Sequence, residues 1–455
     1  MTVSALNVRG VVQDRRFIVL RTVLMSLAII AVFQVSIFLT PTTTFILLDF
    51  VLAVYLVTAF SGKLRYLFLI HPVFLLFSSY GFQIPFSEIG VGHTYLDTFS
   101  MVIDPDTLGI NPSAYEFYQK KESVFGFSKI YFGIIPIIWV PSFLFDYVPD
   151  IVLYYSMGVF NLFYMVLAVF VSQFFKVLKS ENLLIIALFA TVSPTFFDIS
   201  TTLHRYGLLI CGLSIFLISY LGLVKKDKSF TQIIGLLITL IVAVLMVGFS
   251  KPELFYVIFL FLALDLLSSN RLGLLSQIFR TMDKWLFLVF LLLAIQLGAK
   301  ILIPDQHFSL AMNLGGQFES LSDIPILGFV LRVVYSVLSP FPWIGFAQWS
   351  LYGDNYIFLL VHIFSAFTAA WLVLSLVVNF PKVFRADYQD RAILIFGLCL
   401  MLSLMFSGIG FHVYLAPALP FLSIILINKS FRISGVYPVG FCVIMEVVAH
   451  TARLV

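Results

Sequence analysis

Charged residues are scarce in this chain. Only 11 % of its 455 residues are Asp, Glu, Lys or Arg, 61 % are hydrophobic, and the mean hydropathy is +1.06. A soluble domain carries about 25 % charged residues, so the composition excludes an ordinary soluble protein and indicates an integral membrane protein. The net charge of +4 is spread over short basic clusters between apolar segments, which argues against a nucleic-acid partner.

Cysteine is rare as well. Cys211, Cys399 and Cys442 all lie inside apolar runs, where neither a disulfide framework nor a zinc site is expected. The sequence has no fixed-period repeat, no low-complexity linker and no cluster with metal-ligand spacing, so we expect no metal or other cofactor. The first apolar run, 17–40, is too long for a signal peptide and reads as a retained span. We expect residues 1–455 to form one integral membrane domain.

Long apolar runs, in contrast, are abundant. A helix needs about 20 apolar residues to cross a bilayer, and the 51 phenylalanines and 20 tyrosines suit lipid-facing surfaces and interfacial belts. We therefore predict an all-α, polytopic transmembrane helical bundle of about 12–13 spans. The predicted spans are 17–40, 44–61, 66–82, 151–175, 183–200, 207–224, 231–250, 254–268, 285–303, 354–379, 392–409, 411–428 and, as the optional last one, 436–450.

The basic residues predict the topology, because Lys and Arg in short loops mark the cytoplasmic side. The basic residues of the short loops form seven groups. All seven lie on the cytoplasmic side of the membrane only if two further apolar stretches, 129–147 and 326–350, do not cross it. We predict that both are re-entrant or interfacial helices at the outer face, together with a large periplasmic loop, 83–128, and a second one, 304–325. The basic groups are Arg9/Arg15/Arg16, Lys63/Arg65, Lys176/Lys179, Lys225/Lys226/Lys228, Arg271/Arg280/Lys284, Lys382/Arg385/Arg391 and Lys429/Arg432.

Few basic residues fall on the predicted outer side. Arg205 opens the span at 207, Lys251 lies in the turn "GFSKPELF", and Arg332 lies within "GFVLRVVYSVLSPFPW". Cations near helix ends on this side indicate an anionic ligand, since arginine binds phosphate oxygens in a bidentate manner and lysine acts as a point charge. The alternative is that they reach lipid phosphates or pair with neighbouring acids.

The large outer loop supplies carboxylates and aromatic rings. Asp97, Asp104 and Tyr115 lie in it, the last two within "DPDTLGINPSAYEFY", which is typical of a turn followed by a helix start. A carboxylate beside a hydroxyl of a bound carbohydrate can act as general base, and tyrosine can stack on a sugar ring. The alternative is a solvated loop whose acids cap helices and turns. Asp97 is the first candidate, because it lies among apolar residues.

Two further residues complete the candidate site. His204, next to Arg205, is a candidate catalytic group. Trp343, in "LSPFPWIG", is a candidate wall for a sugar or prenyl chain, although tryptophan is also common in interfacial belts.

The order of these features resembles a group of bacterial envelope polysaccharide proteins. The group comprises Wzy-type O-antigen and capsule repeat-unit polymerases and multi-span GT-C-type glycosyltransferases that use polyprenyl-phosphate donors. The resembling parts, a minority of the chain, are the outer loop leading to "AYEFY", then "SPTFFDISTTLHRYGLLI", then "GFSKPELF", and last an arginine shortly before "SPFPW".

The resemblance to the polymerases implies transfer of a growing chain from undecaprenyl pyrophosphate onto the next lipid-linked repeat unit, at the periplasmic face of the inner membrane. It implies pyrophosphate binding by Arg205 and Arg332, supported by Lys251, with a flippase and a chain-length regulator as partners. The large loop comes early here, which departs from the polymerases. In a GT-C-like enzyme such an early loop carries the catalytic acid, which would be Asp97 or Asp104. Under both readings we expect metal-independent inverting transfer.

A transporter or flippase for lipid-linked saccharides is the competing class. Flippases are expected to show an internal repeat, and proton-coupled transporters to carry more charge at mid-membrane. Inside the spans, Asp265 and Glu446 are lone acids with no obvious partner. This pattern favours a glycan-assembling enzyme.

Overall fold

The computed structural model describes residues 15–81, 123–124, 127–128, 135–145, 150–196, 206–225, 228–251, 254–269, 271–302, 327–338, 356–406, 415–428 and 430–454. Apart from turns, these residues are helical, with one short antiparallel pair, β1 (Ser123–Val124) and β2 (Phe127–Ser128). Their contacts group into two compact units, Met1–Glu253 and Leu254–Val455. Each unit has its own buried core, around Leu209 in the first and Phe396 in the second.

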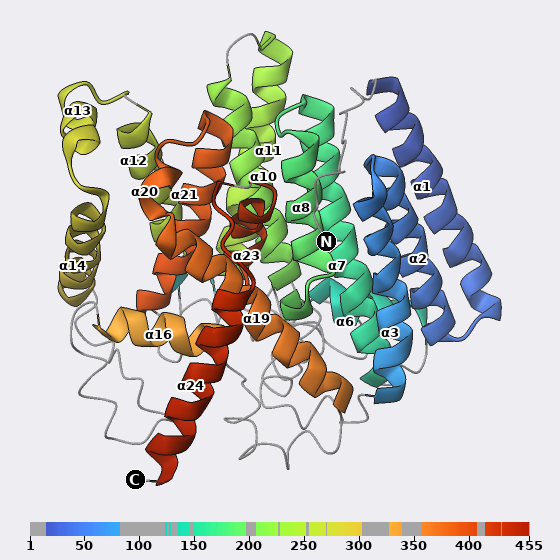
Figure 1. The fold of residues 1–455 in the computed structure, drawn as a ribbon. Helices are drawn as coiled ribbons and strands as arrows, with labels where there is room; N and C mark the ends of the chain where they lie inside the picture. Colours follow the sequence, from blue (N-terminus) through green and yellow to red (C-terminus); the bar gives the residue numbers. More distant parts are fainter. Residues whose placement is uncertain are drawn as a thin grey trace. The chain divides into compact units, whose positions relative to one another are not determined.

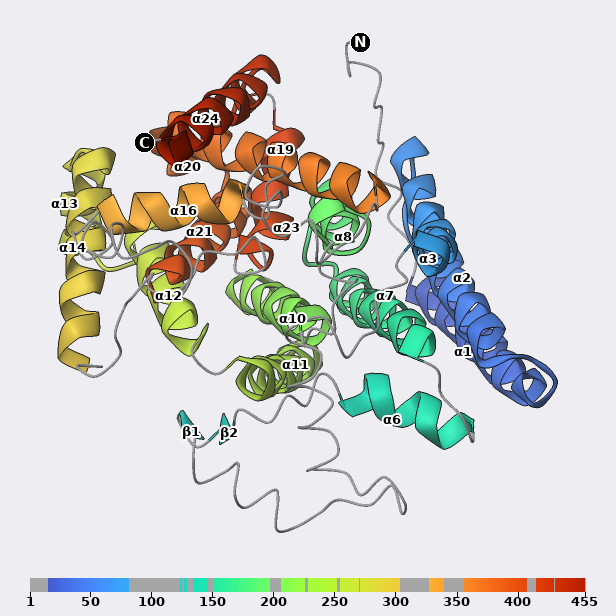
Figure 2. The same cartoon turned by 90° about the horizontal axis from the view of Figure 1, so that it is seen from below.

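The first unit is an array of helices in which α10 packs against both α7 and α11. Figure 1 shows α1, α2 and α7 side by side, and Figure 2 shows the same array from below. The elements are α1 (Arg15–Val35), η1 (Ser36–Phe38), α2 (Pro41–Ala59), η2 (Lys63–Leu69), α3 (Ile70–Gly81), α6 (Ile135–Leu144), α7 (Asp150–Phe175), α8 (Ser180–Thr191), α10 (Tyr206–Val224) and α11 (Phe230–Ser250).

The second unit packs α12 against α21, and α19 against α24. Aromatic side chains fill its core: the ring of Phe396 makes edge contacts with Phe261 and Phe421, at centroid distances of 5.0 and 4.9 Å. The elements are α12 (Phe255–Ser268), α13 (Leu274–Thr281), α14 (Lys284–Leu302), α16 (Leu327–Leu338), α19 (Tyr356–Val378), α20 (Phe380–Val383), α21 (Tyr388–Leu402), η5 (Ser403–Phe406), α23 (Leu419–Leu422), η6 (Ser423–Leu426) and α24 (Val436–Leu454).

Local sequence signals set several helix ends. The Thr40 side chain accepts a hydrogen bond from Thr43 N at the start of α2, where Pro41 occupies the first helical position. Ser229 and Gln232 form a capping box that starts α11. After α7, Lys176 adopts a φ of 53°, the left-handed conformation that commonly ends a helix.

Close packing of α10 and α11 fixes their antiparallel register. A Cβ on Gly212 would lie 2.9 Å from Met246 Cβ, and the Ser219 and Thr239 hydroxyls are 2.8 Å apart. Towards the other end of the pair, a Cβ on Gly222 would lie 2.8 Å from a Leu236 methyl group. Small residues therefore allow the two backbones to approach closely, as at membrane helix interfaces.

Five described helical segments are long and apolar enough to cross a membrane: Arg15–Phe38, Pro41–Ala59, Tyr155–Phe175, Tyr206–Val224 and Phe230–Ser250. On α11, one side exposes Ile234, Ile238 and Ile241, while Leu236 and Val247 are buried. An exposed apolar stripe of this kind suits contact with lipid and not with water. The chain is therefore a helical membrane bundle.

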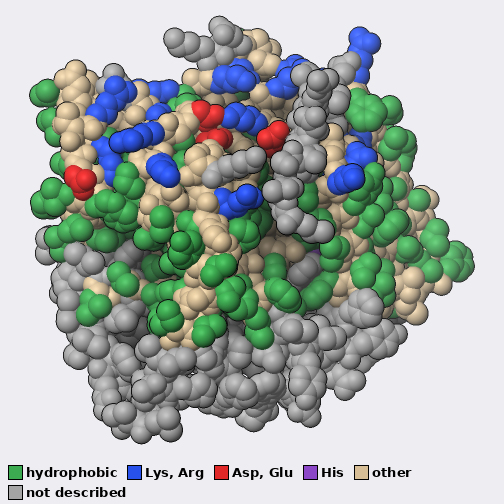
Figure 3. Space-filling view, viewed as in Figure 1, with side chains coloured by type: hydrophobic (Ala, Val, Ile, Leu, Met, Phe, Trp, Pro, Cys, Tyr) green, Lys and Arg blue, Asp and Glu red, His purple; other side chains and the backbone are tan. Residues whose placement is uncertain are grey.

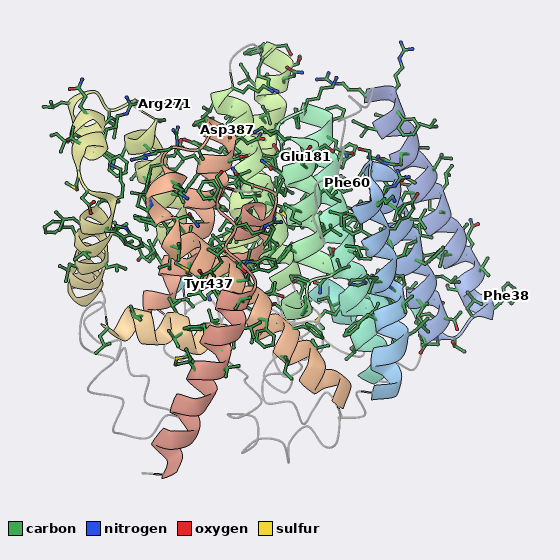
Figure 4. The ribbon with its side chains drawn as sticks, in the orientation of Figure 1. Phe38, Phe60, Glu181, Arg271, Asp387 and Tyr437 are labelled. Carbon is green, nitrogen blue, oxygen red and sulfur yellow. The ribbon has the colours of Figure 1, made fainter. Side chains whose placement is uncertain are left out.

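In the first unit, the described cations of each basic group lie at one end. Arg15 lies over the Phe174 ring near the end of α7, Arg65 donates to Phe60 O, and Lys228 donates to Phe175 O. Figure 4 shows Phe60 and Glu181 at this end and Phe38 at the opposite end. We call it the basic end of the unit.

The second unit has a basic end as well. Lys284 lies over the Phe279 ring, Lys382 donates to Ser430 O, and Arg271 and Arg391 lie on the Tyr388 ring. These contacts bring together α13 with the starts of α14 and α21 and the end of α19. In Figure 3 the lysine and arginine side chains lie in the upper part of the view, among hydrophobic side chains, and the described surface below them is mainly hydrophobic.

The described helices that flank the two ambiguous stretches show where each stretch begins and ends. Because α2 and α7 both end at the basic end, where Gln173 Nε2 donates to Ala59 O, α3 leaves that end and α7 returns to it. The chain between α3 and α7, which includes 129–147, therefore begins and ends on the same side, and α6 within it has only 10 residues. The same reasoning applies to 326–350, between α14 and α19, where the described helix α16 has 12 residues.

Some predicted spans are interrupted or shorter than expected. The span predicted at 66–82 begins as the 3-10 helix η2 and continues as α3, and 254–268 forms the 14-residue α12. The span predicted at 411–428 is wrong as a single helix in its described part, 415–428, which contains turns, α23 and η6. Pro417 and Pro420 lie in it, and each lacks the N–H that a continuous helix needs. The helices α13 and α20 were not predicted.

We predict that Gly212→Ala destabilises the protein by about 1–3 kcal/mol, because the new methyl group would overlap Met246 Cβ and approach the Val247 backbone. Gly440→Ala is the matched control, since a Cβ there has no atom within 4 Å. Thermal unfolding in detergent measures both variants. Equal unfolding midpoints for the two would show that α10 and α11 are not packed this closely.

Candidate functional site

Most residues of the predicted site lie outside the described residues: Asp97, Asp104, Tyr115, His204, Arg205 and Trp343. The loop 304–325 lies outside them too, and only β1 and β2 are described in the loop 83–128. The backbone of Arg332 belongs to α16, but its side chain is not described. Lys251 is the one predicted site residue whose side chain is described; it is half-buried at the end of α11.

The α10/α11 register places Lys251 level with the start of α10. The pairs Ser219–Thr239 and Gly212–Met246 define an antiparallel register, in which each residue farther along α10 lies level with a residue that is earlier in α11. The same register extended to the end of α11 places Lys251 at the level of Gly207, in the first turn of α10. The Lys251 N–H donates to Val247 O at 2.7 Å and so ends α11 at this level. In sequence, Arg205 directly precedes the first residue of α10.

A buried amide from α7 meets the same turn of α10. Asn161 is 4 % exposed, and its Oδ1 has no hydrogen-bond partner among the described residues. A Cβ on Gly207 would lie 1.9 Å from that oxygen, so only glycine at this position lets the amide approach the α10 backbone. The Tyr164 ring lies near the same Cβ position, at 3.3 Å. The sequence pattern gave no sign of Asn161, because a single amide in an apolar run has no distinctive spacing.

The helix α7 continues well past this level. Asn161 lies 14 residues before the end of α7, a rise of about 21 Å from the basic end. The 11 residues from Asp150 to Asn161 add about 16 Å on the far side. On this scale the start of α10 and the end of α11 lie in the half of a hydrocarbon layer about 30 Å thick that is farther from the basic end.

This arrangement offers donors for an anion. The first N–H groups of a helix have no acceptors within the helix and carry a partial positive charge that attracts anions, and the described part of α10 begins at Tyr206. Lys251 adds a full positive charge at the same level, and the Asn161 amide provides polar atoms in otherwise apolar surroundings. Among the described residues, Lys251 and Asn161 supply polar groups at this level, and the predicted acids and Trp343 lie outside the described residues.

The sequence analysis missed an ionisable pair inside the membrane-spanning helices. Asp49 of α2 and His71 of α3 are 0 % and 1 % exposed, with 2.9 Å between Oδ2 and Nδ1. Asp49 lies ten residues before the end of α2, about 15 Å from the basic end and near mid-membrane. Its place in the apolar run "ILLDFVL" was the available signal.

A second buried polar cluster lies at the basic end of the first unit. Arg21 of α1, only 7 % exposed, donates to Gln173 Oε1 at 2.5 Å and to Thr58 O at 3.2 Å, and its guanidinium lies 4.5 Å from the centroid of the Tyr55 ring. This cluster joins α1, α2 and α7. Arg21 follows the predicted topology but lies inside the first span, which the loop-based analysis did not consider.

Neighbouring cations at this end act on one another. Burial lowers the pKa of Lys228, and repulsion from Lys225 and Arg15 lowers it further. Both lysines donate to carbonyl groups at the end of α7, Lys228 to Phe175 O and Lys225 to Lys176 O. The favourable interaction with the negative end of the helix dipole offsets part of this repulsion.

The expectation that Asp265 is a lone acid is wrong. Asp265 is fully buried near the end of α12, and its Oδ2 accepts a hydrogen bond from Tyr388 OH at 3.2 Å. The partner comes from α21, more than 120 residues later in the chain, so the sequence could not reveal it. The side chain of Glu446 lies outside the described residues.

Comparison of the chain with protein-family models, with curated proteins and with solved structures found no match.

We predict that the Asp49–His71 pair is energetically coupled. Leaving one buried partner without the other costs more than removing both, so the destabilisation in Asp49→Ala/His71→Ala should fall short of the sum of the single variants by about 1 kcal/mol. Unfolding of all four proteins in detergent measures this coupling. The pair Ser219 and Thr239, replaced by alanine in the same way, provides a neutral hydrogen-bonded control. Additive effects at Asp49 and His71 would show that the two side chains do not interact.

Proposed function

We propose that the protein is a glycosyltransferase of bacterial envelope polysaccharide assembly in the inner membrane. In this proposal it polymerises undecaprenyl-pyrophosphate-linked oligosaccharide repeat units at the periplasmic face, for lipopolysaccharide or capsule. The basic end of each unit faces the cytoplasm, and the start of α10 with Lys251 faces the other side. The lipid bilayer holds the polyprenyl chain beside this site.

One observation supports the proposal most directly: Lys251, the start of α10 and the buried Asn161 amide lie at one level of the first unit. Leaving-group departure creates negative charge on the lipid diphosphate. Fixed cations and helix N–H groups that already point at this charge stabilise it without reorganisation. Arg205, directly before α10, supplies a second cation in this proposal, and Arg332 a third. Asp97 or Asp104 acts as base towards the acceptor hydroxyl.

A GT-C-like glycosyltransferase with a polyprenyl-phosphate sugar donor is the alternative within the same class. It needs the same anion site, because its leaving group is also a lipid phosphate. The two differ in whether an oligosaccharide or a single sugar is transferred.

The buried Asp49–His71 pair favours a second candidate, a transporter or flippase for lipid-linked saccharides. Ionisable residues inside a membrane are rare and often belong to proton pathways, and this pair lies near mid-membrane. The sequence-based argument against transport assumed fewer such groups than the structure contains.

Deletion of the gene, followed by gel analysis of the surface polysaccharide, distinguishes these functions. Loss of the long-chain ladder with one capped repeat retained identifies a polymerase. A mobility shift of every band identifies a transferase that adds a single sugar. Loss of all surface repeats, with repeat units accumulating in the inner leaflet, identifies a flippase. An unchanged pattern would refute all three.

We predict that Arg205→Ala and Lys251→Ala each lower the rate of glycan transfer by about 100-fold, because each removes a cation from the leaving phosphate. Complementation of the deletion strain, with membrane levels checked by immunoblot, measures the effect. Lys63→Ala is the matched control, since it removes a lysine from the basic end of the same unit. Full activity of both variants, with normal membrane insertion, would contradict the anion site.

A further inference from the structure

The short helix α13 has three distinct sides. Successive residues of a helix are about 100° apart, so Leu274, Leu275 and Ile278 share one side, and they are 71 %, 58 % and 48 % exposed. The next side holds the buried residues Ser276 and Phe279. The remaining side is polar and exposed, with Gln277, Arg280 and Thr281.

The buried side anchors α13 to the second unit. Ser276 Oγ accepts a hydrogen bond from Leu272 N and lies 3.5 Å from Leu266 O, near the end of α12. The Phe279 ring makes edge contacts with Phe287 of α14 and with Phe384, at centroid distances of 4.8 and 5.2 Å. The orientation of α13 about its axis is therefore fixed, and its three leucine and isoleucine side chains point away from the unit.

The position of α13 in the chain places it at a membrane surface. It connects α12 with α14, both apolar, and lies at the basic end of the second unit, next to Arg271 (Figure 4). An exposed apolar side, a polar side and a protein-facing side are what a helix needs at the boundary between hydrocarbon and water. An aqueous surface would instead leave three large apolar side chains exposed to water.

The charges around α13 are mainly positive. Arg271 and Arg280 are exposed at its two ends, and Lys284 donates to the carbonyl groups of Phe279, Arg280 and Met282 at its C-terminal end. Burial lowers the pKa of Lys284; the neighbouring Asp283 raises it, and the positive charge of Arg385 lowers it. The acid next to α13, Asp283, caps α14 by accepting hydrogen bonds from Trp285 N and Leu286 N. The cations therefore exceed the acids.

We propose that α13 is an interfacial helix that binds acidic phospholipids. Its apolar side lies among the upper acyl chains, and Arg271 and Arg280 bind the phosphate groups of lipids such as phosphatidylglycerol. The binding surface consists of Leu274, Leu275 and Ile278 with these two arginines. The proposal does not depend on the proposed function.

Depth-dependent fluorescence quenching tests the proposal on the full-length protein. A fluorophore is attached to Leu275→Cys or, in a second protein, to Gln277→Cys, and the parent chain serves as a labelling blank because Cys211, Cys399 and Cys442 are buried. The proteins are placed in nanodiscs of phosphatidylcholine and phosphatidylglycerol in equal parts, with bromine on the acyl chains of one lipid at a time. We expect strong quenching at position 275 and weak quenching at 277, half a turn away.

Lipid preference is read from the same proteins. Brominated phosphatidylglycerol should quench at position 275 more than brominated phosphatidylcholine. Because a cation at an anionic surface contributes about 1 kcal/mol, Arg271→Gln and Arg280→Gln should each lower the local ratio of the two lipids about fivefold. Lys63→Gln, which removes a charge from the basic end of the first unit, should leave this ratio unchanged.

Two results would overturn the proposal. Equal, weak quenching at 275 and 277 would place the apolar side in water or against a partner protein. A phosphatidylglycerol preference that survives both arginine substitutions would show that these residues do not bind the headgroups. Each variant is first checked for an elution profile and unfolding midpoint like those of the parent, so that misfolding is not mistaken for lost binding.

Discussion

A lysine or arginine cannot easily enter the hydrocarbon layer, and this constraint organises the whole chain. Each basic group is held at one end of its unit by interactions with the helices that end there: Lys228 with the last carbonyl of α7, Lys382 with the backbone at Ser430, and Arg15 with the Phe174 ring. These contacts set the direction of α7, α11 and α19. Consequently the chain segments that join α3 to α7 and α14 to α19 begin and end at the opposite ends of their units, where the proposed chemistry would take place.

The helices of the first unit are joined both by close packing and by polar contacts that the membrane makes necessary. Gly212 and Gly222 let α10 approach α11, and Gly207 lets α10 approach Asn161 of α7. A buried polar group in hydrocarbon needs a partner, and Asp49 with His71 and Arg21 with Gln173 are such pairs. Asn161 differs, because its Oδ1 has no hydrogen-bond partner among the described residues. In the core of a soluble protein, a buried oxygen without a hydrogen-bond partner would destabilise the fold. Near the start of α10 and Lys251, the same oxygen suits a site that binds a polar ligand.

The two surfaces proposed to bind lipid phosphate differ in the burial of their polar groups and in the share of apolar side chains. At α13 the surface consists of three exposed apolar side chains and two exposed arginines, so the expected ligand is any acidic phospholipid of that leaflet. At the start of α10 the Asn161 amide is buried and Lys251 is half-buried, so the ligand proposed there is one headgroup held in a defined orientation.

Hydropathy and charge are local properties of the chain, so the sequence was enough to predict the membrane class and the grouping of the described cations at one end of each unit. That 129–147 and 326–350 do not cross the membrane stays a prediction. The sequence did not reveal the Asp49–His71 pair, the partner of Asp265, the level of Lys251 or the sides of α13. Asp265 and Tyr388 are 123 residues apart, and a hydrogen bond over that distance leaves no trace in a hydropathy pattern. These features depend on which helices pack together and in which register, so only the tertiary structure reveals them.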